Sequence, residues 1–137
     1  ITNNELKLLT PKLLKLACEE MNYSQHIEPP KIVIRTEKQL TKLFCPGKEC
    51  SVSGIYSKGV IYIDKRISIK NEIDVSILYH EFVHHVQAQI YGPTQDCKLW
   101  YRKEKQAYSL QKKYLKSRGI KTSFVSEIMA DLTCPDE

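Results

Sequence analysis

The stretch that decides the fold is NEIDVSILYHEFVHHVQAQIYG, which covers residues 71–92. Its apolar residues recur at the three- and four-residue spacing of one helix face: Ile77, Leu78, Phe82, Val83 and Val86. Asn71 or Asp74 can cap the start of a helix. Gly92, with the proline that follows it, is a stop signal. The sequence therefore predicts an amphipathic helix that ends near Ile90.

Two histidines lie four residues apart in this helix, within His80-Glu81-Phe82-Val83-His84. Residues at that separation lie one above the other on one helix face, so both imidazoles can reach one metal ion. Glu81 lies about 100° around the helix, too far to join them as an equivalent ligand. It can instead take a proton from the attacking water, as the glutamate of zinc peptidases does. We therefore predict a zinc site with Glu81 as general base. The alternative is two surface histidines on a helix.

A catalytic zinc site usually has a third protein ligand, and we predict Glu104 for that position. It lies 20 residues after His84, inside the next predicted helix, and is the one acid among nine basic residues in 98–121. A helix, a turn and a helix fit in that interval. Because Glu104 shares an apolar stripe with Ala107 and Tyr108, its burial is costly unless a metal pairs with it. The alternative is a surface ion pair with its basic neighbours.

Other candidate ligands are placed less well. His85 points about 100° away from the histidine before it, and His26 lies upstream of the first predicted strand. Asp96 lies in the turn between the two helices. Glu127 and Asp131 lie in the last predicted helix. These acids are the reserve candidates for the third position.

The composition is that of one globular domain, residues 1–137, with 42% hydrophobic and 27% charged residues. No apolar run approaches the roughly 18 residues needed to cross a bilayer, so no transmembrane segment is expected. Capping, alternation and turn signals predict these further elements in order: a helical turn over 3–9, a helix begun by Thr10-Pro11 and ending near Asn22, a strand at 31–36, a helix at 37–44, strands at 51–57 and 59–64, and helices at 97–117 and 123–132. The predicted fold class is α+β.

Five cysteines are many for a cytosolic domain of this size. Cys45 and Cys50 flank a Pro-Gly turn that can bring their sulfurs together. We therefore expect disulfides and an oxidising compartment; the alternative is reduced, buried thiols. An odd count leaves one thiol unpaired, and Cys18, inside a predicted helix, is the candidate. The chain begins with Ile1, which a removed signal peptide would explain, so we expect a periplasmic or secreted protein.

The motif His80-Glu81-Phe82-Val83-His84, followed by Glu104-Lys105-Gln106-Ala107-Tyr108, resembles the gluzincin pattern of HExxH with a downstream ExxAY helix. The whole chain resembles a minimal family of short bacterial gluzincin-like zinc metallopeptidases. In that family a cysteine-bounded loop, a strand pair and the motif helix follow in this order, here at residues 45–50, 51–64 and 80–87. The resemblance implies a zincin-like fold, with a sheet of about three strands packed on the two helices. It also implies peptide hydrolysis with Zn²⁺, and a strand within 54–64 that holds an extended peptide.

The chain departs from larger gluzincins because it lacks a second, C-terminal helical subdomain. The usual far wall of the cleft and the oxyanion-stabilising residue are therefore unassigned. Tyr108, one turn beyond Glu104, and His85 are the available hydrogen-bond donors, and we take Tyr108 as a catalytic candidate. A rival function is a zinc-binding module with little or no turnover that binds proteins or anionic surfaces.

The net charge of +5 is concentrated in residues 98–121. Charge alone favours nucleic-acid binding, but a run of lysines is usually a solvated face. Nucleic acid is therefore not an expected partner. We expect a monomer that acts on a peptide or protein substrate.

Overall fold

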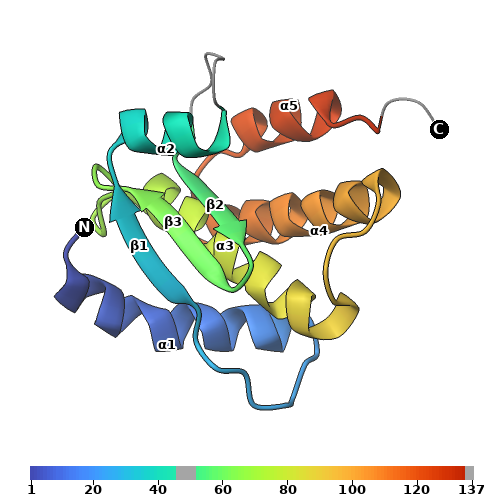
Figure 1. Ribbon diagram of the computed structural model, residues 1–137, viewed down its shortest axis with the longest axis horizontal. Coiled ribbons are helices and arrows are strands. Elements are labelled where there is room, and N and C mark those ends of the chain that lie inside the picture. Colours follow the sequence, from blue (N-terminus) through green and yellow to red (C-terminus); the bar gives the residue numbers. More distant parts are fainter. Residues whose placement is uncertain (46–51, 135–137) are drawn as a thin grey trace.

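The structure is a computed structural model, and it describes residues 1–45 and 52–134. Within these residues the chain forms five helices and a three-stranded sheet, which confirms the α+β class. The elements are α1 (Asn3–Glu20), β1 (Lys31–Arg35), α2 (Glu37–Phe44), β2 (Gly54–Ser57), β3 (Val60–Asp64), α3 (Glu72–Tyr91), α4 (Cys97–Lys116) and α5 (Ser123–Asp131). Figure 1 shows α3 behind the sheet with α4 beside it.

The sheet has the strand order β1-β3-β2. The central strand β3 is parallel to β1, with Lys31 opposite Val60, and antiparallel to β2, with Tyr56 opposite Ile61. The predicted turn at Lys58-Gly59 joins β2 to β3, and both of its residues have positive φ, 49° and 80°. Such a turn suits the twist of a hairpin. β2 is consequently an edge strand, and it packs on α3.

The motif helix α3 is the centre of the molecule. It packs against α1, α4, β2 and β3, and between residues 75 and 87 only Ile77 and His84 are not buried. Asn71 caps it by accepting from the backbone N–H groups of Ile73 and Asp74, and Gly92 ends it at φ 73°. The surrounding core includes Ala17 of α1, Ile61 and Ile63 of β3, Leu115 of α4 and Val125 of α5. The helix predicted as amphipathic is therefore covered on nearly every side.

The N-terminal helix differs from the prediction. α1 begins at Asn3 and continues through Pro11 without a break. Its cap is Thr2, which forms a capping box with Glu5. Thr10, predicted as the cap, instead donates its hydroxyl to the Leu6 carbonyl (2.7 Å). The Thr-Pro pair is compatible with either position, and the better cap upstream makes the prediction wrong.

The cysteines agree with the expected disulfides in part. Cys97 at the start of α4 is bonded to Cys134, and Cys18 is free as predicted. Cys45 is disulfide-bonded, while Cys50, its suggested partner, lies outside the described residues. Among the described helices, none is both long enough and apolar enough to cross a membrane.

Candidate metal centre

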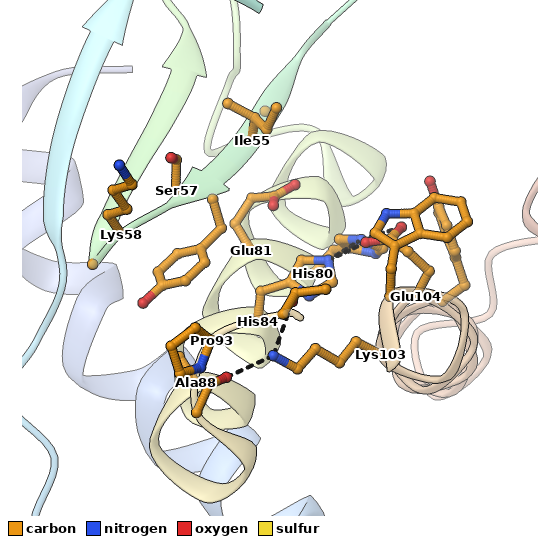
Figure 2. A pocket seen from close by; sticks show the side chains of 17 residues that line it. Ile55, Ser57, Lys58, His80, Glu81, His84, Ala88, Pro93, Lys103 and Glu104 are labelled. Atoms are coloured by element: carbon orange, nitrogen blue, oxygen red, sulfur yellow. Dashed lines mark hydrogen bonds and ion pairs between the residues drawn. The ribbon is translucent and has the colours of Figure 1, made fainter. Parts of the chain in front are cut away.

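Three predicted ligands meet where α4 folds back beside α3. The Nε2 atoms of His80 and His84 are 3.0 Å apart. The Glu104 carboxylate lies 2.6 Å from Nε2 of His84 through one oxygen and 3.6 Å from Nε2 of His80 through the other. Figure 2 shows this carboxylate reaching from α4 toward the two imidazoles on α3. The structure therefore brings together the two histidines predicted from their spacing and the acid predicted from its place on an apolar stripe.

The proton of His84 is placed by the groups behind it. The amide nitrogen of Gln87 donates to the Lys103 carbonyl (2.9 Å) and to Oε1 of Gln106 (2.9 Å). Since a carbonyl only accepts, the amide oxygen of Gln87 must face Nδ1 of His84, at 2.8 Å. An amide oxygen also only accepts, so Nδ1 carries the proton. Nε2 of His84 is then a bare lone pair aimed at the centre.

The proton of His80 is placed by the same logic on different residues. Ser76 donates its hydroxyl to the Ile73 carbonyl (2.6 Å), so its oxygen is left to accept from the amide nitrogen of Gln111 (3.1 Å). The amide oxygen of Gln111 then faces Nδ1 of His80 at 2.9 Å. Nδ1 is therefore the donor, and Nε2 of His80 also presents a lone pair.

When both imidazoles are neutral, two Nε2 lone pairs and one carboxylate converge, so the space between them suits a cation, either a metal ion or a proton. Nitrogen and carboxylate oxygen are the donor set of catalytic zinc sites. Without a metal, a proton has to fill the space. Burial lowers the pKa of His84, but Glu104, Glu81 and the hydrogen bond to Gln87 together outweigh burial and leave that pKa raised. Burial raises the pKa of Glu104, but the hydrogen bonds from both histidines bring it to about 2.

Glu81 lies beside this centre on the β2 side. It forms a group with His80 and His84 whose ligand atoms all lie within 4.8 Å of one another. Its side chain is against Gly54, where an added Cβ would lie 3.4 Å from its carboxylate. Burial raises the pKa of Glu81, while the two histidines and the backbone N–H of Tyr56 lower it less. A raised pKa suits a group that takes up and returns a proton.

The centre opens into a pocket of about 770 Å³. One side is the β2–β3 hairpin, residues 54–59, and the other is α4 with Trp100, Glu104 and Tyr108. The far end is closed by residues 92–94, the connection between α3 and α4. Lys103 fastens this connection by donating to the Gly92 carbonyl (2.8 Å) and the Thr94 hydroxyl (3.0 Å), and Figure 2 shows it extended toward Pro93. The short chain thus has a cleft wall that sequence reasoning left unassigned.

The two candidate donors fall in different places. The Tyr108 ring lies against the His80 ring, with centroids 4.3 Å apart, and lines the pocket. Burial, and then the Glu104 and Glu81 charges, raise the pKa of Tyr108 to about 12, so its hydroxyl stays protonated. His85 is turned away and is used structurally, because its Nε2 donates to the Glu28 carbonyl (2.7 Å) and its Nδ1 accepts from the Tyr56 hydroxyl (2.9 Å). Of these two candidates, Tyr108 is the one that lines the pocket.

The reserve ligands lie apart from the described metal-ligand group. Asp96 is exposed and caps α4 by accepting from the Leu99 backbone N–H (2.8 Å). Glu127 and Asp131 are exposed on α5. His26 is exposed and contacts Glu28 (3.0 Å). Glu104 is the acid that the fold brings to the histidines.

Sequence reasoning missed Gln87, Gln111 and Lys103, all buried between α3 and α4. Lys103 was counted with the surface charges around Glu104, yet its ammonium binds the α3–α4 connection. The available signal was spacing, since Gln87 lies three residues after His84 and Gln111 seven after Glu104. A lone glutamine at helical spacing has many uses, so that signal is weak.

In this α+β fold, an HExxH helix and a glutamate from the next helix meet at one pocket. The protein therefore falls in the class of proteins with a candidate histidine–carboxylate metal centre. The chain belongs to the family described as a domain of unknown function, DUF6647, whose model matches residues 4–136. No curated protein and no solved structure matches the chain.

Proposed function

We propose that this protein is a zinc metallopeptidase of the gluzincin type. His80, His84 and Glu104 would hold the zinc, and Glu81 would be the general base. The observation that carries the proposal is the convergence of two Nε2 lone pairs and one carboxylate in a pocket that Glu81 also lines. With both imidazoles neutral, the three converging groups are all acceptors, and a metal ion between them would satisfy all three.

Zinc held by these residues would polarise a scissile carbonyl and make a water more acidic. The rest of the chemistry belongs to the side chains. Glu81 takes a proton from the water whose oxygen attacks the carbonyl carbon, and returns it to the amine nitrogen as the C–N bond breaks. The Tyr108 hydroxyl, held protonated, donates to the oxygen on which negative charge develops.

The proposed substrate is an extended peptide. β2 is an edge strand, and residues 54–57 line the pocket next to Glu81. A peptide added to this edge would satisfy main-chain groups of β2 and lie along the centre. The Cys97–Cys134 disulfide supports an oxidising compartment, the periplasm or the exterior, as the place of action.

The test compares the zinc-loaded protein with Glu81→Gln on a panel of unfolded proteins and peptide libraries, read by mass spectrometry. We expect cleavage by the wild type, a loss of roughly 10²–10⁴-fold in the variant, and equal zinc content in both. Glu127→Gln, which changes an exposed acid of α5, is the matched control and should cleave normally.

Full cleavage by Glu81→Gln would end the assignment of the base. A wild type that holds one zinc but cleaves nothing on the panel would favour the rival function, a zinc-binding module that acts through binding alone.

A further inference from the structure

Two uncharged side chains stand behind the metal centre, one behind each histidine. Gln87 is 0% exposed and Gln111 is 4% exposed, and neither lines the pocket. Both therefore act through a histidine and cannot touch a substrate. We propose that Gln87 and Gln111 are positioning residues: they fix His84 and His80 in the Nδ1–H tautomer, so that both Nε2 atoms are ready for a metal before it binds. This inference rests on the metal centre of the proposed function.

The two glutamines are anchored in opposite directions. Gln87 belongs to α3 and is held by α4, through the Lys103 carbonyl and Gln106. Gln111 belongs to α4 and is held by α3, through the Ser76 hydroxyl. Each histidine support is therefore also a link between the two helices. Since Glu104 comes from α4 and the histidines come from α3, the same links set the distance between the carboxylate and the imidazoles.

In such an arrangement, the entropy of ordering the two histidines is lost when the protein folds and not when the metal binds. A histidine free to turn and to exchange its proton between two nitrogens must be ordered when the metal arrives. Here the ordering is done by buried amides whose orientation is fixed by groups that only accept, or, for Ser76, by a hydroxyl whose proton is already committed to Ile73. Loss of a hydrogen-bond partner behind a metal-bound histidine typically weakens metal binding 10–100-fold.

The hydrogen-bond partners of the two glutamines also predict that a glutamate is accepted at position 111 but not at position 87. In Gln111→Glu, the Ser76 hydroxyl can rotate and donate to the new carboxylate, which still accepts from His80. In Gln87→Glu, a carboxylate oxygen would face the Lys103 carbonyl at the distance now spanned by an N–H (2.9 Å), and a carbonyl has no proton to give. We expect Gln111→Glu to keep the zinc affinity of the wild type and Gln87→Glu to lose it.

The first measurement is zinc affinity by competition with a chromophoric chelator. Gln87→Leu and Gln111→Leu should bind zinc roughly 10–100-fold more weakly than the wild type. Gln89→Leu is the matched control. Gln89 is exposed on α3 and is not one of the hydrogen-bond partners described above, so the zinc affinity of this variant should be unchanged. Wild-type affinity in both leucine variants, or equal behaviour of the two glutamate variants, would overturn the proposal.

The second measurement needs no variant, so it holds even if the leucine variants fail to fold. Long-range ¹H–¹⁵N correlation spectra of the wild type, recorded first without metal and then with zinc, report which imidazole nitrogens carry protons. We expect protons on Nδ1 of both His80 and His84, protected from exchange with water, in both states, and metal on both Nε2 atoms once zinc is added. Metal on Nδ1 of either residue, or Nδ1 protons that exchange freely, would contradict the inference.

These outcomes are separate from peptidase activity. A protein that binds zinc as described and cleaves no peptide would keep this inference and lose the proposed function. An active peptidase whose zinc affinity ignores both glutamines would do the reverse.

Discussion

On one side of α3, Leu78 and Phe82 are fully buried in the core that α1 and β3 share with it. On the side facing α4, three of the buried residues, Ser76, His80 and Gln87, are polar, and each is hydrogen-bonded to a named partner. Both sides are equally removed from water. They differ in that the first is held by contact area and the second by complementary donors and acceptors.

This difference separates stability from function. Burial of apolar side chains contributes roughly in proportion to area and tolerates exchange of similar shapes. A buried polar group contributes little net stability but costs much when one partner is removed. We therefore expect substitutions on the apolar side to change the free energy of unfolding, and those on the polar side to change metal binding and turnover.

The largest expected effect is on the apolar side. Phe82→Ala should lower the free energy of unfolding by about 3–5 kcal/mol, because it removes a fully buried ring and leaves a cavity. Urea denaturation of the metal-free protein measures this change. Leu8→Ala, at a position that is 66% exposed, is the control and should cost about 0.5 kcal/mol or less. Equal losses of unfolding free energy in the two variants would contradict the idea that contact area holds the apolar side of α3.

The next effect is on turnover at the pocket. Tyr108→Phe should lower the rate of peptide cleavage roughly 10²–10³-fold, about 2.7–4 kcal/mol, if its hydroxyl stabilises the developing oxyanion. Zinc content and unfolding free energy should not change. Tyr101→Phe, on the same helix but outside the pocket lining, is the matched control. A Tyr108→Phe rate equal to that of the control would leave the ring of Tyr108 with only its packing on His80.

The third effect tests metal binding on the polar side of α3. Zinc at 100 times its Kd should raise the free energy of unfolding of the wild type by about 2.7 kcal/mol. In Glu104→Ala this increase should largely disappear, because one ligand is gone. Urea denaturation with and without zinc measures it, and Glu127→Ala, at an exposed position of α5, should respond as the wild type. Normal zinc stoichiometry in Glu104→Ala would remove Glu104 from the proposed ligand set.

The smallest effect tests the contact between β2 and Glu81. An alanine Cβ at position 54 would lie 3.3 Å from Ile77 Cγ2 and 3.4 Å from Glu81 Oε2, so the carboxylate must shift slightly. Gly54→Ala should lower turnover by up to about tenfold, about 1.4 kcal/mol, with the unfolding free energy nearly unchanged. Steady-state kinetics beside a denaturation curve decide it. A loss of stability without loss of rate would make Gly54 a packing residue only.

Much of the fold was predictable because its signals are local. α3 was predicted from its caps, its apolar spacing and Gly92, and the ends of α4, predicted at residues 97 and 117, lie within one residue of those in the structure. The helical turn predicted over residues 3–9 is part of α1, but its continuation through Pro11 was not predicted, since a Thr-Pro pair resembles a cap even when a helix passes through it. The parallel pairing of β1 with β3 was not predictable either, because it joins residues far apart in the chain.

The candidate site divides in the same way. His80, Glu81 and His84 follow from a spacing on one helix, and Glu104 from an isolated acid on an apolar stripe. Gln87 and Gln111 matter through the partners that the folded helices bring to them. The wall at residues 92–94 depends on Lys103, a residue whose sequence neighbours suggested a solvated charge.

Lys103 takes part in two hydrogen-bond networks, one through its side-chain ammonium and one through its backbone carbonyl. Its ammonium holds the pocket wall at Gly92 and Thr94, and its carbonyl accepts from Gln87 behind His84. A ligand that pushes this wall outward would pull on Gln87, which orients His84, a proposed zinc ligand. By thermodynamic linkage, such a ligand would change the affinity for zinc, and zinc would change the affinity for that ligand by the same factor. Occupancy of the cleft and retention of the metal would then be one coupled equilibrium.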